Sequence, residues 1–186
     1  MELKGRAIPL LVIVAIIGLI VAGVFHIIGM ATPNWEQTFS SYQGPETLVK
    51  YSGLWAICNR VSVDTYHCEP FIELESVKKH MPAVQALCIL GFMCGVCAII
   101  FLGLYVFLAS GKVKGIFKVL GITTCFLAGL FVMIGIIIYG VKLNESEPAD
   151  FLRRSYNISW SFGLSATSAV ICIVSGLLAT IGAVRK

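Results

Sequence analysis

The chain of 186 residues is 58% hydrophobic and only 13% charged, and its 14 Lys and Arg residues outnumber its 10 Asp and Glu residues. Soluble domains carry about a quarter charged residues and under about half apolar ones. This composition excludes an ordinary soluble protein and indicates that lipid is the solvent for most of the chain.

Four long apolar segments follow one another along the chain, over approximately residues 8–30, 82–109, 116–141 and 160–184. Each reaches the ~20 residues that a helix needs to cross a hydrocarbon core of ~30 Å. Backbone groups in lipid must satisfy their own hydrogen bonds, so we expect four transmembrane helices. The first segment follows a basic start, as a signal peptide would, but exceeds the roughly 7–15 apolar residues of one, and we interpret it as a retained helix.

The placement of charges predicts which side of the membrane each connection occupies. The two termini and the connection 110–115 contain a single acid, Glu2, and the basic residues Lys4, Arg6, Lys112, Lys114, Arg185 and Lys186. The connections 31–81 and 142–159 hold the nine other acids. Positive residues favour the cytosolic side, so both termini are expected in the cytosol and these two loops outside the cell. The net charge of +4 then lies beside anionic lipids and implies no nucleic-acid partner.

The apolar segments themselves carry few chemical groups. They contain no Asp or Glu, which argues against a pump or an ion-coupled transporter. His26 and Gln85 lie toward the outer ends of two segments, where we expect them at the membrane surface. Gly91 and Gly95 form a GxxxG pattern, which allows close helix packing. Such a pattern serves contacts within one chain or between copies, and we favour contacts within the chain.

The loop 31–81 is long enough to fold as a small sheet. Val, Tyr, Trp, Ile and Thr are frequent from residue 47 to residue 68, which is typical of strands. Cys58 and Cys68 flank a turn-like centre that contains Asp64, so they are expected on adjacent strands of a hairpin. Outside the cell they would form a disulfide, which contributes roughly 2–3 kcal/mol when it closes so short a loop.

A metal site that includes His67 beside the two cysteines is the weaker alternative. The three histidines show no metal-binding spacing, and no nucleophile lies in an evident pattern with a base. We therefore expect no metal, no cofactor and no enzymatic activity.

A motif of the first outer loop combines Trp35, Gly53-Leu54-Trp55, Cys58 and Cys68. This W…GLWxxC…C pattern resembles the superfamily of claudins, epithelial membrane proteins and peripheral myelin protein. The resemblance continues through the later helices and covers essentially the entire chain. It implies a single tetraspan domain over residues 1–186: a membrane all-α four-helix bundle with a small extracellular antiparallel β-sheet, four strands from the first loop and one from the second.

The resemblance also implies a structural role in cell–cell adhesion or junctional barrier formation at the plasma membrane. Its partners would be the bilayer and further copies or relatives, in the same membrane and across the intercellular gap. Asp64 and Glu69 would then be candidate charges for paracellular ion selectivity, because carboxylates favour cations in a narrow passage. The alternative, that both are merely solvated, stays open.

Other branches of the superfamily offer two further functions. One is an auxiliary, gamma-type subunit of an ion channel or receptor, and the other is a myelin-protein-like organiser of membranes. The end at Arg185-Lys186 lacks the Tyr-Val-type scaffold ligand common in claudins, which favours the epithelial and myelin branch. In the second loop, Asn144 and Asn157 each begin an N-glycosylation sequon.

Overall fold

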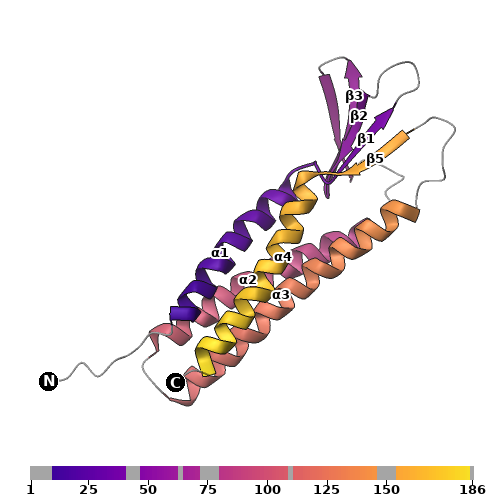
Figure 1. Ribbon diagram of the computed structural model, residues 1–186. Coiled ribbons are helices and arrows are strands. Elements are labelled where there is room, and N and C mark those ends of the chain that lie inside the picture. The colour runs from indigo at the N-terminus through magenta and orange to yellow at the C-terminus, as the bar shows by residue number, and fades with distance from the viewer. Residues whose placement is uncertain are drawn as a thin grey trace.

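The computed structural model describes residues 10–40, 47–62, 65–71, 80–108, 111–145 and 154–184. Within these ranges the elements follow in the order α1 (Leu10–Ala31), β1 (Glu36–Ser40), β2 (Thr47–Ser52), β3 (Ala56–Ser62), β4 (Thr65–Pro70), α2 (Met81–Phe107), α3 (Lys112–Glu145), β5 (Arg154–Ile158) and α4 (Trp160–Val184). The helices form one elongated bundle, and the strands project beyond one end of it (Figure 1). The start of α1 and the end of α4 lie at the other end.

Four helices in the described part of the chain are long and apolar enough to cross a membrane. Their outward surfaces carry many large apolar side chains, such as Ile17, Met93 and Ile137, each of which is more than half exposed. Water would make such a surface costly, whereas lipid solvates it well. The predicted fold class, a four-helix bundle with a small antiparallel sheet, is therefore confirmed.

Helix α3 is longer at both ends than the expected range 116–141. Hydropathy marks only the part of a helix that lipid surrounds. The helix itself begins earlier, at Lys112, and ends later, at Glu145, so it includes more polar residues at both ends. The connection to α2 is correspondingly short, and Gly111 makes the turn at φ 113°, a conformation that favours glycine. The ammonium group of Lys114 donates a hydrogen bond to the carbonyl of Leu108 (3.0 Å), just past the end of α2.

Small residues allow the helices to approach closely. A Cβ atom added to Gly29 of α1 would lie 2.5 Å from Ser165 Oγ of α4, and one added to Gly91 of α2 would lie 2.5 Å from Val132 Cγ2 of α3. Helix α1 thus packs mainly on α4 and α2 mainly on α3, while contacts between α1 and α2 are sparse. Gly91 makes its close contact within the chain.

The sheet has five strands in the order β4-β3-β2-β1-β5, and every neighbouring pair is antiparallel. The first loop supplies four strands, and β5 from the second loop pairs with β1, where Gln37 lies opposite Asn157. Between the sheet and the helices lies a buried cluster built from Trp35, Leu54, Met81, Val84, Tyr139 and Leu143. This cluster fixes the sheet to the bundle.

Candidate functional site: the outer sheet and its seat on the helices

Trp35 anchors the sheet to the bundle. Its side chain is fully buried, and its indole N–H donates a 2.7 Å hydrogen bond to the carbonyl of Gly29. That carbonyl belongs to the last turn of α1, where no N–H from the same helix is available to it. The indole also packs edge-on against Tyr139 of α3 and Phe162 of α4, with ring centroids 5.0 and 5.6 Å apart. One side chain therefore joins three helices to the start of the sheet.

Gly53 and Leu54 lie on the connection between β2 and β3, next to the membrane helices. A Cβ atom at Gly53 would collide with the backbone of Pro33, so this position admits only glycine. Leu54 is fully buried, and its carbonyl accepts a 2.8 Å hydrogen bond from the Gln85 side chain of α2. Gln85, expected at the membrane surface, thus ties the motif to α2. Trp55 differs from the other tryptophan of the motif because 39% of its surface is exposed.

Glu36 is a buried acidic residue that sequence reasoning missed. It is the first residue of β1, directly after Trp35 in the sequence, and it is 4% exposed. Its carboxyl oxygen Oε2 accepts a hydrogen bond from the Tyr139 hydroxyl of α3 (3.2 Å) and lies 3.5 Å from the Ser52 hydroxyl of β2. A buried polar group costs free energy unless it is hydrogen-bonded, so this contact adds a polar tie between sheet and bundle. The sequence of β1 contains no signal for this burial, because Glu36 and Thr38 share one face and the apolar Phe39 lies on the other.

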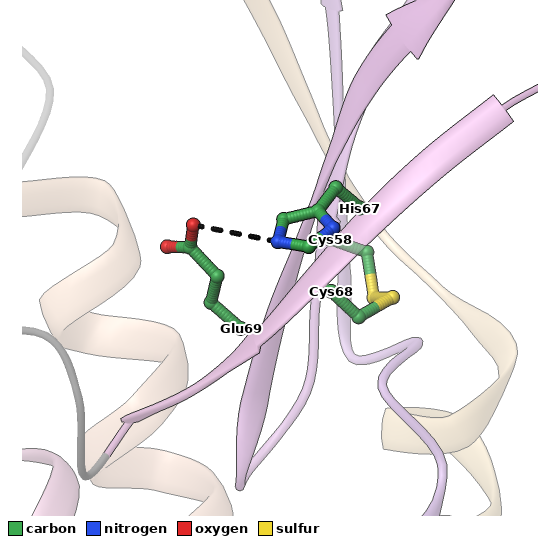
Figure 2. Close-up of polar contacts among 4 residues, drawn as sticks. All are labelled: Cys58, His67, Cys68 and Glu69. Carbon is green, nitrogen blue, oxygen red and sulfur yellow. Dashed lines mark ion pairs between the residues drawn. A yellow bond between two sulfur atoms is a disulfide. The ribbon is translucent and has the colours of Figure 1, made fainter.

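Cys58 and Cys68 form a disulfide between β3 and β4, where they are directly opposite each other in the register. Cys58 is fully buried and Cys68 is exposed, and the bond links β3 to the edge strand β4. Figure 2 shows it beside His67 and Glu69 of β4. The five remaining cysteines are free and lie on the helices.

Glu69 is the one candidate selectivity charge within the described residues, and Asp64 lies outside them. On β4 the Glu69 carboxylate points the same way as the His67 ring two residues earlier, with 3.9 Å between Oε1 and Nε2 (Figure 2). The Glu69 side chain is 42% exposed, and the His67 side chain is 71% exposed. An exposed carboxylate on an edge strand can meet ions or a partner.

The two sequons occupy different kinds of structure. Asn144 lies in the last turn of α3, instead of the expected loop 142–159, because the helix continues to Glu145. Asn157 lies on β5 at the edge of the sheet, and its side chain is exposed. Use of either site remains a prediction. Among the residues that the structure describes, no group of three or more His, Cys, Asp or Glu side chains is close enough to hold a metal ion.

Comparison with known proteins agrees with this arrangement of motif, sheet and bundle. The sequence model of the PMP-22/EMP/MP20/Claudin family matches residues 6–179. The chain therefore belongs to this family of structural membrane proteins, as its outer-loop motif predicted. Two similar relatives are Claudin-1 of Mus musculus and Claudin-1 of Rattus norvegicus, each 24% identical over 170 residues that cover 86% of this chain and 80% of the relative.

Proposed function

We propose that this protein acts in cell–cell adhesion and junctional barrier formation, with its sheet as the contact surface outside the plasma membrane. The observation that carries the proposal is the firm attachment of the sheet to the helices. Hydrogen bonds of Trp35, Leu54 and Glu36 hold it on α1, α2 and α3 respectively. A binding surface held rigidly loses little freedom when it meets a partner. The sheet is therefore suited to present a fixed surface to a second copy or a relative.

The charge distribution supports an outward-facing sheet. Both connections at the sheet end are rich in acids, and the first turn of α3 at the far end carries Lys112 and Lys114. The positive-inside rule favours the cytosol for that far end. A tag placed at either terminus would then be accessible to antibody only after permeabilisation, whereas an epitope in the first loop would be accessible on intact cells. The opposite labelling pattern would contradict this orientation.

An exposed apolar residue near the tip of the β3–β4 hairpin is the natural contact point. Val61 is 70% exposed, and it lies at the end of β3 away from the membrane-proximal motif. Full burial of a valine contributes about 1.5–3 kcal/mol, so covering Val61 in a contact contributes roughly 1–2 kcal/mol. That corresponds to roughly a five- to thirtyfold change in the contact equilibrium.

Aggregation of suspended, otherwise non-adhesive cells tests the adhesive function. Cells that express the protein should cluster, and Val61→Lys should strongly reduce clustering at equal surface expression. Val113→Lys is the matched control, because Val113 is also largely exposed but lies at the start of α3 far from the sheet. Absence of clustering by the unaltered protein would overturn the proposal. Changed currents of a co-expressed channel would then point to the auxiliary-subunit function.

We include paracellular selectivity for cations in the proposal, with Asp64 and Glu69 as the charges that carry it. The exposure of Glu69 supports its part, since a buried carboxylate could not line a passage. In epithelial monolayers that lack their own selective pores, Asp64→Asn with Glu69→Gln should lower the sodium-over-chloride permeability ratio. His67→Arg, which places a permanent positive charge beside Glu69, should lower it as well. The conservative Glu69→Asp should retain it, and an unchanged ratio in the double variant would exclude this role.

A further inference from the structure

The strand register divides the side chains of the outer sheet between two faces. Successive side chains of a strand point to opposite faces, and residues that lie opposite each other on neighbouring strands point to the same face. Lys50 of β2 lies opposite Asn59 of β3, and Asn59 lies opposite His67 of β4. Glu69 follows His67 by two positions and therefore shares this face. We call the face with Lys50, Asn59, His67 and Glu69 the charged face.

The opposite face of the sheet has a different chemistry. It carries the disulfide, which in Figure 2 is directed away from the His67 and Glu69 side chains. The rings of Tyr51 and Tyr66 pack against each other on this face, with their centroids 5.0 Å apart. Its basic residue Arg60 donates hydrogen bonds to two backbone carbonyls of the sheet, at 3.1 and 3.4 Å. We call this face the tyrosine face.

Lys50 places a positive charge on the same face as Glu69. Within the part of the chain that the structure describes, Lys50 forms no ion pair, and its side chain is partly exposed. Two strand spacings and two residue steps separate the two residues, so their Cα atoms lie about 12 Å apart. Their long side chains bring the charges toward the ~8 Å over which charges act at physiological salt. An ion that passes along the charged face therefore meets both charges.

We propose that Lys50 is a further selectivity-determining residue of the paracellular passage and that it opposes Glu69 from the same face of the sheet. This inference rests on the proposed paracellular function and adds the path that the ion takes. The path follows the charged face, and the tyrosine face does not line it. Because a fixed positive charge accompanies the carboxylate, the preference for cations is weaker than Glu69 alone would produce.

Coulomb's law sets the size of the effect. In water, the interaction of two unit charges 10 Å apart is about 0.7 RT, which changes the local concentration of an ion about twofold. Sodium and chloride respond to Lys50 in opposite directions, so the charge changes their permeability ratio by up to about fourfold. Salt screens part of this interaction, and the expected change is therefore about two- to fourfold.

Dilution potentials across epithelial monolayers that lack their own selective pores test the role of Lys50. Lys50→Gln should raise the sodium-over-chloride permeability ratio about two- to fourfold, and Lys50→Arg should leave it unchanged. If Lys50→Gln leaves the ratio unchanged while Asp64→Asn with Glu69→Gln lowers it, Lys50 has no such role and the proposed cation selectivity stands. If neither variant changes the ratio, the proposed selectivity is wrong, and the inference is wrong with it.

Two exposed asparagines test which face the ion follows. Asn59 lies on the charged face, whereas Asn157 of β5 lies on the tyrosine face, because its partner Gln37 is also the partner of Tyr51. Asn59→Asp should raise the ratio about two- to fourfold, and this variant tests the charged face even if Lys50→Gln does not reach the cell surface.

Asn157→Asp is the matched control, because it adds the same charge to the other face and should leave the ratio unchanged. Asn157→Gln removes the same sequon without adding a charge and serves as its reference. Surface biotinylation shows that the compared variants reach the plasma membrane in equal amounts. An equal rise in Asn59→Asp and Asn157→Asp would refute the assignment of the path to the charged face.

Discussion

Replacing Trp35 by phenylalanine tests whether the indole holds the sheet on the bundle. The change keeps an aromatic ring but removes the N–H that reaches the Gly29 carbonyl at 2.7 Å. That carbonyl is then left without its partner in a buried position, which costs about 1–3 kcal/mol. A chain of this size changes its melting temperature by roughly 2–4 °C per kcal/mol, so the expected loss is roughly 2–12 °C.

The assay uses the cysteines of the protein. Cys88, Cys125 and Cys172 are buried in the helices, so a thiol-reactive fluorogenic dye reports their exposure when the detergent-solubilised protein unfolds. The chain offers matched controls, because Trp55 and Trp160 are 39% and 51% exposed. Trp55→Phe and Trp160→Phe should change stability by no more than about 0.5 kcal/mol.

Two results would refute this reasoning. If Trp35→Phe melts within the experimental error of the unaltered protein, the indole–carbonyl hydrogen bond does not stabilise the junction. If Trp55→Phe lowers the melting temperature as much as Trp35→Phe does, the loss reflects general removal of indole surface instead of this bond. Trp35→Ala, which also removes the ring contacts, should cost more, about 3–5 kcal/mol.

Two further changes probe the packing of the bundle and its polar tie to the sheet. Gly91→Ala should destabilise by about 1–3 kcal/mol because its Cβ would crowd Val132, whereas Gly95→Ala, with its nearest contact at 4.0 Å, should not destabilise. Glu36→Gln and Tyr139→Phe should each destabilise the protein, and their double-mutant cycle should give a coupling of about 0.5–3 kcal/mol, because the two side chains share a hydrogen bond.

Both predictions use the same thiol-dye unfolding assay and have clear contrary outcomes. Equal stability of the Gly91→Ala and Gly95→Ala variants would mean that α2 and α3 can separate without cost. Strictly additive losses for Glu36→Gln and Tyr139→Phe would mean that the carboxyl and the hydroxyl do not act as a pair. In that case the packing of the rings of Trp35 and Tyr139 would be the main tie between the start of the sheet and α3.

Local patterns in the sequence were sufficient for the elements and the family. Long apolar segments predict helices because, in lipid, the backbone groups of each segment must form their hydrogen bonds within that segment. The hairpin with Cys58 and Cys68 is equally local, since only ten positions separate the two cysteines. The motif of Trp35, Gly53, Leu54 and Trp55 identified the family without any knowledge of its contacts.

Only the tertiary structure decided what these residues touch. Glu36 meets Tyr139 across 103 positions of the chain, and His26 meets Ser168 across 142. Hydropathy cannot reveal such pairs, because they depend on how each helix is rotated about its axis and which neighbour covers it. The sequence by itself therefore determined the number of helices, the strands and the family motif. The packing of helices against one another decided that Glu36 is a buried tie. It also decided that His26, which was expected at the membrane surface, is an interior residue, because α2 and α4 cover its ring.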